Sequence, residues 1–202
     1  MKFLIPFLLF VQLYALDIES DKYSFRVGYG YASAKDLGEI LCLGDFSHHP
    51  RTLNVISFDA GYLLKKEAFS LPLDIYIKNG FAYFNEDRFD DAFEATLYIK
   101  AYLNIDFWDN RVRIGAAEGL SYVSSLLETE VVEALEDNEP TSKFLNYLDI
   151  SFDIDFGKLI GYKPLYKSYV GYALKHRSGV FGLYYGIHGG SNYNTFYLET
   201  NF

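Results

Sequence analysis

Eight stretches of this sequence alternate between apolar and polar residues with a period of two, which is the spacing of a β-strand that has two different faces. They lie near residues 22–33, 53–65, 72–85, 93–105, 110–124, 143–157, 167–179 and 192–202. No segment shows helical periodicity of comparable strength. We therefore predict an all-β fold of antiparallel strands joined by turns.

The alternation confines charge to one face of each stretch. Within residues 93–105 the odd-numbered positions are all apolar, whereas the polar face carries Glu94, Thr96, Tyr98, Lys100, Tyr102 and Asn104. Residues 144–156 repeat the pattern, with Asp149, Asp153 and Asp155 on the polar face. A soluble β-sandwich whose apolar face points inward produces the same alternation, so the pattern alone leaves two folds open.

The first fifteen residues, MKFLIPFLLFVQLYA, have the layout of a secretory signal peptide. One Lys precedes an apolar run that ends at the small residue Ala15. An N-terminal membrane anchor is the alternative, but the run is shorter than the roughly 20 residues that a spanning helix needs. We expect a signal peptide at residues 1–15 and a single domain at residues 16–202.

Beyond this leader no stretch stays apolar for 18 residues, so only strands are available to cross a membrane. The chain contains 19 Tyr and 18 Phe and ends at Phe202, and aromatic girdles are typical of outer-membrane barrels. The sequence thus predicts an eight-stranded antiparallel up-and-down transmembrane β-barrel in a Gram-negative cell outer membrane. We expect the long connections at residues 34–52, 125–142 and 180–191 to be external, and side chains to fill the interior, which argues against a solute pore.

Composition and charge narrow the possible partners. A formal net charge of −9 argues against nucleic-acid binding. Cys42 is the only cysteine, so no internal disulfide or cysteine cluster can form, and we expect neither a metal nor a cofactor. His48 and His49 are interpreted as a solvated pair, and the Glu-rich residues 125–142 as a solvated acidic loop. Calcium bridging from that loop to lipopolysaccharide phosphates is the alternative.

Polar residues interrupt the apolar face in the last two stretches. Leu174 faces outward, and the two-residue period then places His176 and Ser178 outward as well. A hairpin centred near residue 185 would set Asn192 opposite Ser178 and Asn194 opposite His176. A His and a Ser on one outward row can act as a general base and a nucleophile.

Two further polar residues share this parity. Glu118 in the fifth stretch and Asn146 in the sixth face outward, unless a β-bulge near Gly119 turns Glu118 inward. Charge on a lipid-facing wall is costly, which makes an outward carboxylate a functional candidate. If the last four strands are neighbours in order, all these residues form one polar patch.

These residues carry a family resemblance. The stretch YALKHRSGVFGLYYGIHGGSNYNTFYLETNF resembles the C-terminal hairpin of PagL-type lipid A 3-O-deacylases and of the related acyloxyacyl hydrolase-like barrels. The segments AAEGLSYVSS and FLNYLDISFDID are similar to the hairpin that precedes it. The resemblance is specific in the His-x-Ser element and the last strand, and only architectural in the first half of the chain.

The resemblance implies an outer-membrane esterase that removes an ester-linked acyl chain from lipid A, with Ser178 as nucleophile and His176 as base. The acid of that family has no direct counterpart here, because its place falls near Asn192. Loss of this charge costs about 10⁴-fold in rate in the best-studied triad. We name Glu118, bridged by Asn146, as the replacement acid. The alternative is Asn194, which would hold the imidazole tautomer without a charge.

The tetrahedral oxyanion would need fixed donors, and the amides around Gly179 and residues 189–192 are the expected suppliers. The alternative function is a non-enzymatic structural or lipopolysaccharide-binding barrel of the OmpX type, with its external loops as the working surface. The two hypotheses differ in one feature, because only an esterase needs His176 and Ser178 within hydrogen-bond reach.

Overall fold

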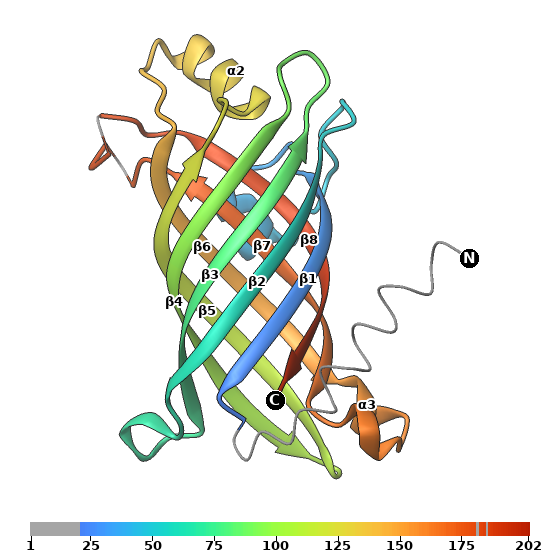
Figure 1. Ribbon diagram of the computed structural model, residues 1–202. Helices are drawn as coiled ribbons and strands as arrows, with labels where there is room; N and C mark the ends of the chain where they lie inside the picture. The colour runs from blue at the N-terminus through green and yellow to red at the C-terminus, as the bar shows by residue number, and fades with distance from the viewer. Residues whose placement is uncertain (1–20, 181, 185) are drawn as a thin grey trace.

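The computed structural model describes residues 21–202 except residues 181 and 185, so the predicted signal peptide lies outside the described residues. Eight antiparallel strands form a closed barrel in which each strand pairs with its sequence neighbours and β8 pairs with β1 (Figure 1). The strands are β1 Tyr23–Ala32, β2 Asn54–Lys65, β3 Leu73–Asn85, β4 Ala92–Phe107, β5 Asn110–Val123, β6 Phe144–Asp155, β7 Ser168–Ser178 and β8 Gly190–Asn201. The predicted fold is confirmed.

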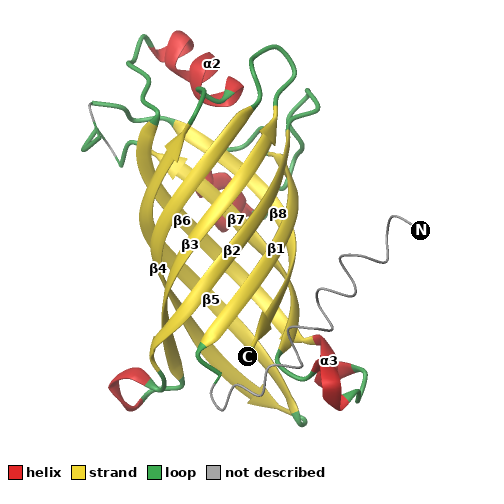
Figure 2. Cartoon of the chain, viewed as in Figure 1, coloured by secondary structure: helices red, strands yellow, loops and turns green. Residues whose placement is uncertain are grey.

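The alternation in the sequence is the direct cause of this architecture. In β4 the polar residues from Glu94 to Asn104 are buried inside the barrel, whereas Phe93, Leu97 and Ile99 are exposed on its outer wall. Strands therefore dominate the cartoon, and helices occur only in the connections (Figure 2). Among the described residues, no helix has the length and apolar character needed to cross a membrane.

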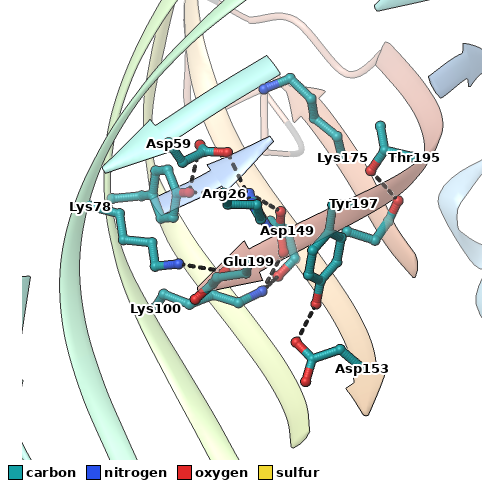
Figure 3. A network of polar contacts seen from close by, with 12 residues as sticks. Arg26, Asp59, Lys78, Lys100, Asp149, Asp153, Lys175, Thr195, Tyr197 and Glu199 are labelled. Atoms are coloured by element: carbon teal, nitrogen blue, oxygen red, sulfur yellow. Dashed lines mark hydrogen bonds and ion pairs between the residues drawn. The ribbon is translucent and has the colours of Figure 1, made fainter. Parts of the chain in front are cut away.

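The interior of the barrel is filled by buried ion pairs and tyrosines (Figure 3). Arg26 contacts Asp59 at 2.9 Å and Asp149 at 2.8 Å, and Lys78 contacts Glu199 at 2.8 Å. Removing one partner of such a pair leaves a buried charge uncompensated, so these contacts are interdependent. The expectation that side chains fill the interior is confirmed.

The two longest connections, residues 33–53 and 124–143, lie at the end of the barrel away from the start of β1 and the end of β8; we call this the distal end (Figure 1). The connection between β3 and β4, at the same end, is short, and the one between β6 and β7, at the opposite end, is longer than the rule for periplasmic turns predicts. The connection between β1 and β2 contains a short helical turn, η1 Glu39–Leu43, and the one between β5 and β6 contains α2 Glu128–Asp137. The opposite end carries η2 Ala68–Ser70, α3 Phe156–Leu159 and η3 Lys163–Leu165.

The prediction of a solvated acidic loop at residues 125–142 is wrong. Glu128 is fully buried and forms an ion pair with Arg51. Glu130 is also buried, where it accepts a hydrogen bond from the Ser191 hydroxyl at 2.8 Å and lies 3.4 Å from Arg177. These carboxylates compensate cations at the distal end of the barrel, and that pairing stabilises a helix where the composition indicated a loop.

Candidate active site on the outer wall of the barrel

The register of the last four strands brings the outward polar residues together. His176 pairs with Leu148 of β6 on one side and with Asn192 of β8 on the other. Ser178 pairs with Asn146 and with Gly190. The predicted hairpin register is therefore wrong by two residues, because Asn192 lies opposite His176 rather than opposite Ser178.

The imidazole of His176 is held by Asn192. Its Nδ1 lies 2.8 Å from Oδ1 of Asn192, and Nδ2 of the same amide donates to the main-chain carbonyl of Lys35 at 3.1 Å. A carbonyl only accepts, so this second bond fixes which end of the amide faces the ring. Oδ1 must then accept from Nδ1–H, and Nε2 is left as the basic nitrogen.

Ser178 is half-buried, and its Oγ accepts a hydrogen bond from the amide of Val180 at 3.4 Å. Between the described side chains of His176 and Ser178 the structure contains no hydrogen bond. They do, however, line one cavity. Catalytic hydrogen bonds are often long before substrate binds, so the geometry is compatible with a base and a nucleophile that engage on substrate.

This cavity has a volume of about 660 Å³ and lies between the barrel wall and the distal connections. Its wall side is formed by Glu118, Asn146, Leu148, His176, Ser178 and Asn192. Its other side is formed by residues 36–38, 41 and 42 of the first connection, by Glu133 of α2, and by Val180 and residues 188–190 of the last connection. The cavity thus combines several polar groups with an apolar lining from Leu37, Leu41 and Leu148.

The first connection, residues 33–53, folds back over the outer wall of β7 and β8. Phe46 packs edge-on against Tyr172, with ring centroids 5.6 Å apart. Leu174 and Asn194 have outward parity, yet they are only 1% and 0% exposed. We infer that the segment that supplies the Lys35 carbonyl also covers this part of the wall.

Asn194 does not contact His176. It pairs with Leu174, and its Oδ1 accepts a hydrogen bond from the Tyr172 hydroxyl at 2.5 Å. The hypothesis that Asn194 holds the imidazole tautomer therefore does not match the structure, in which Asn192 makes that contact. The two-residue difference in hairpin register is the physical reason.

Glu118 is exposed on the outer wall, as its parity predicts. The pairing of β5 continues without interruption through Gly119, so the alternative of a bulge that turns Glu118 inward is wrong. In the register, Leu148 lies between Glu118 and His176, which keeps the carboxylate from the position next to the ring that Asn192 occupies. Asn146, the partner of Ser178, lines the cavity and is 6% exposed.

Two of the amides expected to bind an oxyanion, those of Gly179 and Gly190, are engaged in this conformation. The amide of Gly179 donates to the carbonyl of Gly189 at 3.2 Å. The amide of Gly190 donates to Oε2 of Glu133 at 3.0 Å. Sequence reasoning did not single out Glu133, because a Glu in an acidic stretch carries no signal of a partner 57 residues away.

The remaining candidates for chemistry near the cavity are a second histidine, His188, and a metal site. His188 lies 2.8 Å from Glu139 at the rim. Within the part of the chain that the structure describes, no group of three or more His, Cys, Asp or Glu is placed to hold a metal ion. The arrangement is that of a serine, a histidine and an amide in a partly apolar cavity.

Comparisons with known proteins bear on the fold. No family model and no curated protein sequence matches the chain. Among solved structures, the outer membrane enzyme PagL is similar with a TM-score of 0.61 and 11% identity, over 89% of this chain and 99% of that one. Neisserial surface protein A is similar with a TM-score of 0.49 and 11% identity, over 91% of this chain and 98% of that one. At these identities the likeness shows that the chain shares the eight-stranded barrel fold of PagL.

Proposed function

We propose that this protein is an outer-membrane esterase that removes an ester-linked acyl chain from lipid A. The observation that carries the proposal is that His176 and Ser178 line the same cavity on an otherwise apolar wall. In that cavity Asn192 sets the tautomer of His176. A general base with a defined basic nitrogen beside a hydroxyl nucleophile is the minimum that acyl transfer requires.

The membrane location is supported by the surface of the barrel. Its outer wall exposes large apolar residues along every strand, whereas most charged side chains of the strands are buried inside. The fold is shared with a protein described as an outer membrane enzyme. The cavity lies toward the distal end, which is the external end if the termini are periplasmic, so it would meet lipid headgroups and the start of their acyl chains.

The reaction proceeds in two steps. Nε2 of His176 takes the hydroxyl proton as Oγ of Ser178 attacks the ester carbonyl, and the electron pair of the C=O bond moves to oxygen. When that pair returns, the bond to the sugar oxygen breaks, and His176 gives its proton to the leaving alcohol. Water then attacks the acyl-serine by the same route, which releases the fatty acid and restores Ser178.

Asn192 acts as a positioning residue in this scheme. Its Oδ1 orients the imidazole as a carboxylate would, but it brings no negative charge to stabilise the imidazolium. We expect a slower enzyme than one with an acid at this position. Glu118, exposed in the same cavity, remains a proposed long-range source of negative charge.

A structural or lipopolysaccharide-binding barrel is the second candidate. Two observations favour it: His176 and Ser178 are not hydrogen-bonded to each other among the described contacts, and the amide of Gly190 is occupied by Glu133. On this hypothesis the polar cavity would bind lipid without cleaving it.

A fatty-acid release assay separates the two candidates. The folded barrel is incorporated into vesicles that contain lipopolysaccharide, beside the His176→Ala and Ser178→Ala variants and a His48→Ala control. His48 is exposed, stacks on Tyr31 and does not line the cavity, so its loss should leave the rate unchanged. Release by wild type and control alone supports the esterase, and equal release by all four proteins contradicts it.

A further inference from the structure

The carboxylate of Glu133 contacts the stretch of β8 backbone that pairs with the proposed nucleophile, Ser178. Its Oε2 accepts the amide hydrogen of Gly190 at 3.0 Å, and Gly190 is the register partner of Ser178. A methyl group added at Gly189 would lie 2.7 to 2.9 Å from the carboxyl carbon and both oxygens, so the carboxylate packs directly on this glycine pair. Glu133 also lines the cavity of His176 and Ser178.

A main-chain amide beside a nucleophile is the group that stabilises the oxyanion of acyl transfer. An amide that donates to a carboxylate is shown to be placed for binding an anion, but while the carboxylate is bound the amide cannot donate to an oxyanion. We propose that Glu133 occupies the oxyanion-binding amide of this site and keeps the enzyme in a closed resting state. This inference rests on the proposed function, since a blocked amide matters only if Ser178 attacks an ester.

The surroundings of Glu133 make its charge easy to lose. Burial raises the pKa of Glu133, and the nearby carboxylates of Asp36, Asp137 and Glu139 raise it further, whereas the Gly190 amide lowers it. The other titratable groups lining the cavity are Cys42, Glu118, His176 and His188. Among the described ion pairs, none involves Glu133, and His188 is paired with Glu139 instead.

The rest of α2 is attached independently of this carboxylate. Glu128 is bound to Arg51, and Glu130 is bound to Ser191 and Arg177. A change at Glu133 alone therefore leaves the helix held at two other points. Glu136 lies on the same helix, is exposed, and provides a matched control for the loss of one negative charge.

The test compares the folded wild-type barrel with Glu133→Gln and Glu136→Gln, and it measures fatty-acid release from lipopolysaccharide vesicles at neutral pH. Glutamine has the size of glutamate but gives up a charge-assisted hydrogen bond to the amide, so we expect Glu133→Gln to be about tenfold faster or more. Glu136→Gln should match wild type. The ratio of Glu133→Gln to wild type should shrink toward one at acidic pH, because wild-type Glu133 is then neutral.

A second readout separates this inference from the proposed function. A fluorophosphonate ester labels an activated serine by forming an O–P bond to Oγ with loss of fluoride, and the serine proton passes to the histidine. Labelling of Ser178 should be faster in Glu133→Gln than in wild type and absent in Ser178→Ala. Activity in wild type without any gain in folded Glu133→Gln overturns the inference alone. No hydrolysis and no labelling in any folded variant overturns the proposed function and the inference together.

Discussion

Replacement of Asn192 by Asp tests how the imidazole of His176 is held. Oδ1 of Asn192 lies 2.8 Å from Nδ1, so an aspartate oxygen at the same place would accept the same hydrogen bond and add a full negative charge. Charge-assisted bonds are roughly twice as strong as neutral ones, and the missing charge costs about 10⁴-fold in the best-studied triad. We expect Asn192→Asp to hydrolyse acyl esters about 10- to 100-fold faster than wild type, below that ceiling.

The second bond of Asn192 explains why the gain stays below the ceiling. Nδ2 donates to the Lys35 carbonyl at 3.1 Å, and aspartate would set an oxygen against that carbonyl. An unsatisfied carbonyl costs about 1 to 3 kcal/mol, so the variant should also be less stable toward urea by that amount. The assay is fatty-acid release at matched folded amounts, with Glu118→Gln as a comparison that we expect to change the rate less than Asn192→Ala. A folded Asn192→Asp that is no faster than wild type would show that the missing negative charge at this position does not limit the rate.

Two further predictions concern the stability of the barrel. Arg113 donates two hydrogen bonds, of 2.8 and 2.7 Å, to Asp153 inside the barrel, so Arg113→Met should lower the free energy of unfolding by about 3 to 5 kcal/mol. The control is Arg111→Met, which removes the part-exposed ion pair with Asp106 and should cost about 1 kcal/mol or less. Equal losses in urea titrations would contradict this. Burial raises the pKa of Glu86 from 4.5 to about 7. The unfolded chain therefore loses this proton first, so between about pH 4.5 and 7 stability should fall by up to about 3 kcal/mol as pH rises. Glu86→Gln should flatten that slope in unfolding measurements at several pH values, and an unchanged slope would show that another group is responsible.

The strands could be predicted closely because each residue's polarity shows directly whether it faces the polar interior or the apolar wall. The start and the end of each predicted stretch fall within two residues of those of the observed strand. The outward direction of His176, Ser178 and Glu118 follows from the same parity. These features need no knowledge of the connections.

The contacts of the site depend on the connections, and these were not predictable. The turn between β7 and β8 sets which Asn meets His176, and a difference of two residues exchanges Asn194 for Asn192. The Lys35 carbonyl reaches Asn192 across 157 positions of sequence, and Glu133 reaches Gly190 across 57. Such contacts arise from the fold of the first connection and of α2, for which strand periodicity carries no information.

The esterase proposal is tested most directly by mass spectrometry of lipid A from cells that carry the wild-type barrel or its Ser178→Ala variant at matched folded amounts. We predict that lipid A loses the mass of one hydroxyacyl chain with wild type and keeps it with the variant. Identical spectra, with both proteins folded in the outer membrane and ester-linked chains available, would contradict the esterase proposal and favour a barrel that binds lipid without cleaving it.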